Sequence, residues 1–199
     1  GPLMATVSGG GIDAQVFTNE AKNIQVGLFY STSWNDLGAS ANSIRLNFRA
    51  RPGSRWQFTV APSWRESNNA RQYIGVYPGG TAATYDARYV FSWVKQTTLS
   101  MQLRLNYSFT PGLTLEAYAE PFASSGNFSQ YGELAEAETT TLRAYGTDNT
   151  TISQDPSGNY VVTDGNNGQT FTLPNNSFNV LSYRSHVVLR WEWRPGSAL

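Results

Sequence analysis

The sequence contains no cysteine, a single histidine, and few charges, which balance. Its 199 residues carry 14 Lys and Arg against 14 Asp and Glu, a charged fraction of 14 %. The absence of Cys excludes disulfide scaffolds, Cys-rich zinc sites and thiol catalysis. A net charge of zero argues against nucleic acid as a partner, because proteins that bind it carry a basic surplus. Lys is the scarcest charged residue, with two Lys beside twelve Arg, which is unusual for a water-facing surface.

Long apolar runs are also missing. The longest contain only a few residues, so we expect no transmembrane helix. The first residues, Gly1-Pro2-Leu3-Met4, have neither the basic region nor the apolar stretch of a signal peptide. They are interpreted either as native or as a protease-cleavage scar followed by a start Met. The length fits one domain or part of one.

The pattern that is present is alternation with period two. Six long segments alternate between apolar and polar residues, and a seventh does so more weakly. Each long segment has about the length of a strand that crosses a bilayer at a tilt. The segments are 23–31, 42–50, 55–65, 99–109, 113–121 and 181–193, with the weaker one at 11–17.

The connections between these segments alternate between short and long. Three contain Pro-Gly, at 51–54, 110–112 and 194–197, which favours tight turns. The others, 32–41, 66–97 and 122–178, are long and polar, an asymmetry typical of outer-membrane barrels. Within them, 89–94, 160–162 and 170–173 are predicted as strands. The acidic run containing Glu133, Glu136 and Glu138 is predicted as a short helix.

Side chains alternate across a strand, so parity sorts the residues into two faces. On one face every position except Ser185 is apolar or aromatic. Its aromatic side chains cluster at strand ends, as in interfacial girdles. The girdle residues are Phe48, Trp56, Trp64, Tyr107, Phe109, Trp191 and Trp193. The opposite face is predicted to line a barrel interior with Arg45, Arg49, Arg104, Glu116, Glu120, Arg184, His186, Arg190 and Glu192.

A soluble β-sandwich explains the alternation equally well, and it would bury Trp56, Trp191 and Trp193 in a core. Three features favour lipid outside and water inside. The aromatic residues gather at strand ends, the polar face has no Lys, and the strands exceed the usual five or six residues. The predicted fold is therefore an all-β, antiparallel transmembrane β-barrel, partial, with about seven strands plus a stub. We treat 1–199 as one barrel segment, with 122–178 as a long extracellular loop carrying small hairpins.

No catalytic set, cofactor or metal site is predicted. His186 has no local carboxylate to orient it as a general base. Glu116 and Glu120 lie roughly 13 Å apart along one strand, beyond the separation used in glycoside hydrolysis. Ion pairing of these Glu and of Glu192 with nearby Arg is the preferred interpretation. Turn formation explains the Asp and Asn residues at 148–166 better than a calcium site.

Two binding hypotheses stay open. The Arg excess on the polar face either favours anionic solutes in a pore or fills a plugged interior. Five tyrosines in the long loops either stack on sugar rings or pack between hairpins; they are Tyr73, Tyr77, Tyr85, Tyr131 and Tyr160.

Several stretches also carry a family resemblance. They include Phe17-Thr18-Asn19-Glu20-Ala21-Lys22-Asn23, 88–100, 103–111, Tyr118-Ala119-Glu120-Pro121-Phe122, Tyr131-Gly132-Glu133-Leu134 and 188–197. Together with Gly1-Pro2-Leu3-Met4, they resemble the C-terminal domain of unknown function in bacterial proteins that begin with a carbohydrate-binding family 9-like module. The resemblance implies an outer-membrane β-barrel and makes a glycan a candidate ligand. That module is absent here, and the chain stops at Leu199 where the family continues with a further strand, so we expect a fragment.

The sequence thus predicts a segment of a cell-surface protein of the bacterial outer membrane that handles or passes a glycan or other ligand. The expected partners are the lipid bilayer, a glycan, and the rest of its own barrel or another envelope protein. The alternatives are a soluble carbohydrate-binding sandwich, a membrane-anchored hydrolase and a structural subunit of an envelope assembly.

Overall fold

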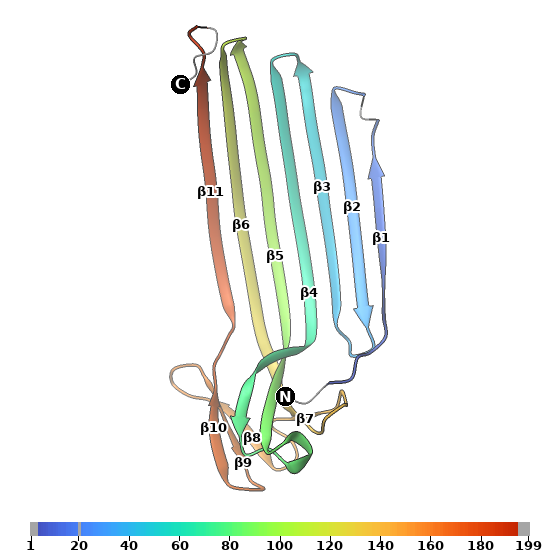
Figure 1. Cartoon of the computed structure of the whole chain (residues 1–199), viewed down its shortest axis with the longest axis vertical. Helices are drawn as coiled ribbons and strands as arrows, with labels where there is room; N and C mark the ends of the chain where they lie inside the picture. The colour runs from blue at the N-terminus through green and yellow to red at the C-terminus, as the bar shows by residue number, and fades with distance from the viewer. Residues whose placement is uncertain (1–3, 20, 195–199) are drawn as a thin grey trace.

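A computed structural model describes residues 4–19 and 21–194. Its main feature is one long antiparallel sheet in the order β1-β2-β3-β4-β5-β6-β11, with β7 added beside β6 (Figure 1). The strands of this sheet are β1 (Gly9–Phe17), β2 (Ile24–Asn35), β3 (Ser40–Gly53), β4 (Trp56–Pro78), β5 (Ala87–Thr110), β6 (Leu113–Leu134), β7 (Leu142–Ala144) and β11 (Phe178–Trp191). The expected all-β, antiparallel class is confirmed.

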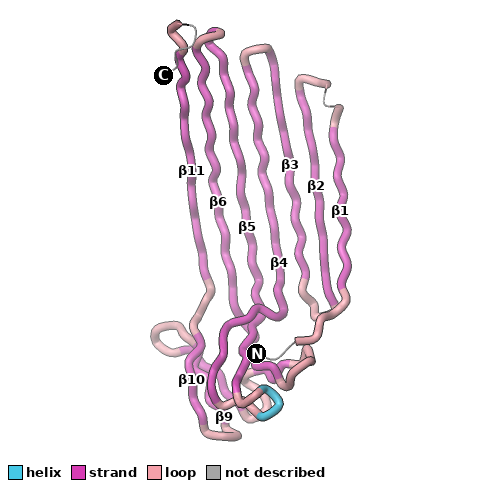
Figure 2. The backbone as a smooth tube through the Cα atoms, in the orientation of Figure 1, coloured by secondary structure: helices cyan, strands magenta, loops and turns pink. Residues whose placement is uncertain are grey.

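A second, three-stranded sheet lies at one end of the long strands (Figure 2). It contains β8 (Thr150–Gln154), β9 (Tyr160–Asp164) and β10 (Gln169–Leu173), all antiparallel. A short 3-10 helix, η1 (Ala82–Thr84), closes the connection between β4 and β5. We call this end the loop end and the opposite end, which carries the Pro-Gly connections 51–54 and 110–112, the turn end.

The alternating segments coincide with parts of the long strands, and in β4, β5 and β6 they form the part nearest the turn end. Several strands are therefore much longer than predicted. β4, β5 and β6 contain 23, 24 and 22 residues. The predicted loop 66–97 is therefore mostly a hairpin, with 79–86 as its connection. The strands predicted at 89–94, 160–162 and 170–173 lie in β5, β9 and β10. Part of the Pro-Gly connection at 194–197 and the predicted stub lie outside the described residues.

The short helix predicted for the acidic run is wrong. Glu133 belongs to β6, and the chain then turns through 135–138. Glu138 has a φ of 60°, in the left-handed region that a right-handed helix does not use. Glu133 itself is 6 % exposed, because its carboxylate is needed in a buried ion cluster described below.

The buried core lies between the small sheet and the loop end of the long sheet. It consists of Val90, Tyr131, Tyr145, Val162 and Leu173. Among the loop tyrosines, Tyr85 is 71 % exposed but Tyr131 only 2 %. Tyr131 therefore packs between elements, against Tyr160 with ring centroids 4.8 Å apart.

Among the residues that the structure describes, no second layer covers either face of the long sheet along its main length, as Figure 1 shows. The sheet is also open among the described residues, because β1 and β11 each have one neighbour in the order of strands. The sequence predicts only part of a barrel, and the described residues form an open sheet with no closed barrel. Residues 4–19 and 21–194 contain no helix long and apolar enough to cross a membrane.

Candidate functional site

The register of the long sheet separates two kinds of side chain over all seven strands. Opposite partners include Tyr30 with Ile44 and Ile44 with Trp64, all on one face. Arg45 pairs with Ser63, and Ser63 pairs with Ser100, on the other. Cross-strand partners share a face, so the apolar and polar sets predicted from parity each stay together. We call these the apolar face and the polar face.

The apolar face is arranged in cross-strand rows. At the loop end, one row contains Tyr30, Ile44, Trp64 and Leu99. At the turn end, Trp56 and Tyr107 contact each other at 4.3 Å between ring centroids, and Tyr107 contacts Phe109 at 4.6 Å. Trp191 and Trp193 meet at 6.2 Å.

Phe48 differs from the other predicted girdle residues. It lies opposite Val60, which lies opposite Leu103, in the middle of the apolar face rather than at its rim. The sequence predicts Phe48 beside the Pro-Gly turn, whereas β3 extends to Gly53 with a register shift between Ala50 and Gly53.

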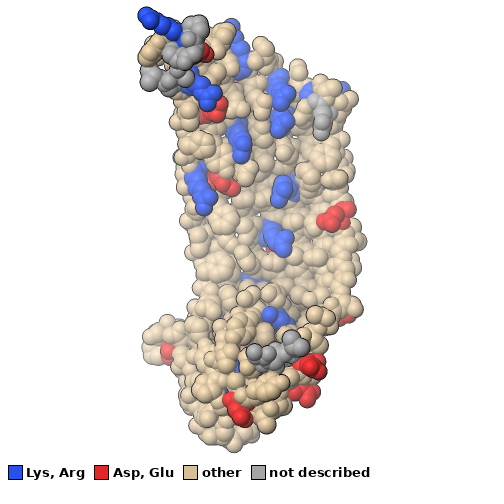
Figure 3. All heavy atoms as spheres, in the orientation of Figure 1, with Lys and Arg blue, Asp and Glu red and all other residues tan. Residues whose placement is uncertain are grey.

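The polar face carries most of the predicted lining residues. Figure 3 shows Lys and Arg side chains spread along the sheet, with few Asp or Glu between them. The register places eight of the nine on this face: Arg45, Arg49, Arg104, Glu116, Glu120, Arg184, His186 and Arg190. The ninth, Glu192, follows the end of β11 and donates its backbone N–H to the Gly112 carbonyl at 2.7 Å.

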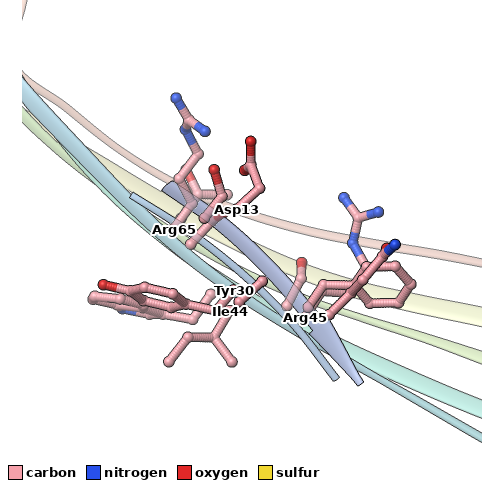
Figure 4. Close-up of a pocket in the computed structure, with 13 residues that line it drawn as sticks. Asp13, Tyr30, Ile44, Arg45 and Arg65 are labelled. Atoms are coloured by element: carbon pink, nitrogen blue, oxygen red, sulfur yellow. The ribbon is translucent and has the colours of Figure 1, made fainter. Parts of the chain in front are cut away.

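A hollow of about 570 Å³ lies over β1 to β4. Figure 4 shows Asp13, Arg45 and Arg65 projecting from one side of the strands and Tyr30 and Ile44 from the other. Both Arg side chains are exposed. The sequence set of lining residues omitted Asp13 and Arg65, although Arg65 has the parity of the polar face.

These Arg side chains have no carboxylate partner. The ion pairs within 4.0 Å in the described part of the chain join Arg88 and Arg143 to Glu133 and Asp164, and Lys95 to Glu66. Arg45, Arg49 and Arg65 belong to none of them. Arg49 is half-buried, and its Nε has no hydrogen-bond partner.

On β5 and β6 the charges are held by uncharged neighbours instead. Tyr118 donates its hydroxyl to Glu120 at 2.6 Å, and Gln102 donates to the other oxygen at 3.5 Å. The Arg104 guanidinium lies 5.2 Å from the Tyr118 ring centroid. The direct ion pairs predicted for Glu116 and Glu120 are therefore not present within 4.0 Å among the described residues.

His186 stacks on the ring of Tyr118 with centroids 5.0 Å apart. Its pairing with Tyr118 across β6 and β11 follows from the register. The arrangement supports the interpretation of His186 as a polar side chain held by neighbours rather than as a general base.

A cluster of buried charges at the loop end was missed at the sequence level. Arg88 donates to both oxygens of Glu133 at 3.0 and 2.8 Å and to Asp164 at 2.7 Å. Arg143 donates to Glu133 at 3.0 Å and to both oxygens of Asp164 at 2.9 and 3.0 Å. Tyr145 donates to Glu133 at 3.2 Å. We call Arg88, Glu133, Arg143, Tyr145 and Asp164 the buried ion cluster.

The cluster joins β5, β6, β7 and β9, so it ties the small sheet to the long one. One signal could have revealed it, because Arg88 continues the alternation of Val90, Ser92 and Val94, which are buried. An Arg on the buried side of a strand needs a carboxylate. Its partners Glu133 and Asp164 lie 45 and 76 positions away in the sequence, so the alternation does not identify them.

The cluster sets the ionisation of its members. Hydrogen bonds from Arg143, together with those from Arg88 and the Asn166 backbone N–H, hold the pKa of Asp164 well below its usual range, against the opposing effect of burial. Burial, with the neighbouring Glu133 carboxylate, raises the pKa of Tyr145. Burial also raises the pKa of Tyr131 to about 12.

Turn formation explains Asp155, as predicted. Its carboxylate accepts the backbone N–H groups of Ser157 and Asn159, both at 2.9 Å. Asp164 likewise accepts the Asn166 backbone N–H at 3.1 Å, and it also belongs to the buried ion cluster. In residues 4–19 and 21–194, no three His, Cys, Asp or Glu side chains are grouped so as to hold a metal ion.

Comparisons with protein families, with curated proteins and with solved structures find no match for this chain. The resemblance described from the sequence therefore remains a prediction.

Proposed function

We propose that the chain forms part of the wall of an antiparallel β-barrel in the bacterial outer membrane. The apolar face would contact lipid, the polar face would border an aqueous interior, and the loop end would lie outside the cell. The observation that carries this proposal is the separation of apolar and polar side chains over seven strands, with no layer covering the apolar side.

The exposed area supports a lipid contact. The chain exposes 12482 Å², whereas a folded water-soluble monomer of its mass exposes about 9,300 Å². The exposed residues include large apolar side chains, with Leu181 82 %, Leu189 56 % and Leu99 55 % exposed.

A soluble sandwich would bury the tryptophans at the turn end. Trp56, Trp191 and Trp193 are 46 %, 52 % and 52 % exposed. These residues are on an uncovered face, so the observed burial does not favour a sandwich.

The height of the apolar face also fits a bilayer. From Leu99 to Phe109, β5 covers about 33 Å along the strand, or about 25 Å of membrane at a tilt of about 40°. Just beyond Leu99 toward the loop end, the same face carries the ion pair of Lys95 with Glu66 at 3.3 Å. We expect the boundary between the membrane and water at the level of this charged pair.

The function we infer is the handling or passage of a ligand along the polar face at the cell surface. The resemblance to a domain that accompanies a carbohydrate-binding module keeps a glycan among the candidates. A hydrolase is less well supported, because the buried carboxylates of Glu133 and Asp164 are both occupied by Arg88 and Arg143.

The test uses variants with one tryptophan each, the other five being replaced by Phe. After reconstitution into vesicles of phospholipid brominated in its acyl chains, Trp64 fluorescence is expected to be strongly quenched. Trp93 is the matched control, because it lies on β5 beyond Lys95 toward the loop end and is expected to keep its fluorescence.

Equal quenching of Trp64 and Trp93, or none at either, would contradict the lipid-facing assignment. Fractionation of expressing bacteria adds a second readout, since the chain is expected with the outer membrane and not in the soluble fraction.

A further inference from the structure

We propose that the polar face of β3 and β4 binds anionic solutes through Arg45 and Arg65. This inference rests on the proposed function, since it requires the polar face to be in contact with water and solutes. It adds the chemical class of the ligand, which is an anion carrying carboxylate, sulfate or phosphate oxygens.

The first support is the placement of the guanidinium groups. Arg45 lies opposite Ser63, and Ser43 lies opposite Arg65, so Arg45 and Arg65 are diagonal neighbours on one face. Diagonal neighbours in a sheet are about 7–8 Å apart at Cα, close enough for long side chains to reach a common ligand. Figure 4 shows both projecting from the same side of the sheet.

The second support is that no nearby carboxylate balances the positive charge of these Arg side chains. The polar-facing positions of β2 to β5 carry Arg but no Asp or Glu. Asp13 shares a row with Arg65, with Ser31 and Ser43 between them. Three strand spacings place Asp13 and Arg65 about 14 Å apart. Glu120 on β6 is already bonded to Tyr118 and Gln102.

The third support is a set of hydroxyl groups beside the charges. Ser63 and Ser100 share a hydrogen bond of 2.7 Å, and Thr98, opposite Arg65, shares one of 2.9 Å with Ser124. Arg offers a planar set of N–H donors that matches the oxygens of carboxylate, sulfate or phosphate. The hydroxyl groups add donors, and the hollow of about 570 Å³ has room for such a group.

The charges are thus segregated across the sheet, with uncompensated Arg on β3 and β4 and the carboxylates Glu116 and Glu120 on β6. Fixed charge of one sign on a wall raises the local concentration of ions of the opposite sign. Arg that merely filled a plugged interior would instead be expected to meet carboxylates or backbone carbonyls.

The experiment measures the local concentration of anions directly. A Ser43→Cys variant, labelled with a fluorophore on the polar face, is placed in lipid vesicles or detergent micelles. Quenching by iodide is compared with quenching by neutral acrylamide. Replacing both Arg45 and Arg65 by Gln is expected to lower the iodide-to-acrylamide ratio about twofold at 0.1 M salt, because two charges about 8 Å away are removed.

The matched control is the double variant Arg184→Gln and Arg190→Gln. It removes the same charge from β11, and its ratio at Ser43 is expected to change little. Inorganic phosphate or sulfate, added at constant ionic strength, should lower iodide quenching more than chloride does in the parent chain and in the β11 control, but not in the Arg45 and Arg65 variant.

An unchanged ratio in the Arg45 and Arg65 variant, or an equal change in the control, would overturn the proposal. An equal effect of phosphate, sulfate and chloride would overturn the assignment to oxyanions. The Arg side chains would then attract anions through their positive charge alone, without binding an oxyanion. Lipid quenching of Trp64, measured in the same samples, reports separately on the proposed membrane function.

Discussion

Arg88 is 1 % exposed, and its charge is balanced by Glu133 of β6 and Asp164 of β9, which are distant in the sequence. The two Arg and two carboxylates of the buried ion cluster are neutral together. A buried charge that loses its partner is costly, by about 3–5 kcal/mol. At this site the penalty falls on the docking of the small sheet.

We therefore expect Asp164→Asn to destabilise the loop end by about 3 kcal/mol. The change leaves Arg88 and Arg143 facing one carboxylate. Hydrogen exchange of the backbone amides in 142–173 is expected to accelerate about a hundredfold or more, while exchange in the central part of β5 stays unchanged. Glu66→Gln is the matched control, because its partner Lys95 is 57 % exposed and such pairs contribute about 0–1 kcal/mol.

The same residue fixes the direction of the pH dependence. Because the pKa of Asp164 is depressed in the folded chain, its stabilisation is complete above the unfolded pKa of about 3.9. It is lost as the pH falls through the lower folded value. The near-ultraviolet circular dichroism of the loop-end tyrosines should stay constant from neutral pH to about pH 5 and decline below about pH 4. An unchanged decline in Asp164→Asn would assign it to another group.

At the scale of single strands, parity decides the environment of neighbouring residues. Leu103 and Gln102 are consecutive in β5, yet Leu103 pairs with Val60 on the apolar face and Gln102 with Ala61 on the polar face. If lipid covers the apolar face, Leu103→Arg is expected to cost about 2–4 kcal/mol near the bilayer midplane. Gln102→Arg places the same charge on the opposite face and should cost much less.

Reversible urea unfolding in lipid vesicles measures both free energies. The comparison is sharp because the two variants share charge, strand and depth. Equal costs would show that the two faces do not differ in environment, and the assignment of lipid to the apolar face would then fail.

The accuracy with which the sequence predicts each strand depends on how regularly apolar and polar residues alternate along it. From Trp56 to Trp64, and from Leu99 to Phe109, every second residue is apolar or aromatic. This alternation is sufficient to predict a strand in each segment. Beyond Trp64 the signal stops, because the residues at 65–69 are polar on both faces. Farther along, β4 contains register shifts between Asn69 and Gln72 and between Tyr73 and Gly75. Each shift puts an extra residue into β4 and moves its side chains to the other face.

The candidate site divides in the same way. Membership of the polar face was predictable for Arg45 and Arg49, since it depends only on parity within β3. The ion pairs expected for Glu116 and Glu120 were not predictable, because they depend on distances across strands. Glu133 was interpreted as part of a local acidic run, but its partners Arg88 and Arg143 come from β5 and β7.

At the scale of the whole molecule, the direction of the strands limits how the sheet can be extended. The seven long strands described here are antiparallel to their neighbours throughout, so β1 and β11 run in the same direction. Pairing β11 with β1, within one chain or between two copies inserted the same way, would give a parallel pair. Any further strand that continues the antiparallel pattern must therefore run antiparallel to both β1 and β11.

The edges give the last prediction. Every residue of β11 is exposed, and only its side toward β6 is paired. Unpaired backbone groups in a bilayer cost several kcal/mol each, whereas water or a micelle surface satisfies them. In detergent, about half of the amides in 178–191 should exchange rapidly, while those in 99–107, which lie between β4 and β6, should be protected. Full protection of 178–191 would mean that the outer edge of β11 is paired with another strand, and the open sheet would not be the solution state.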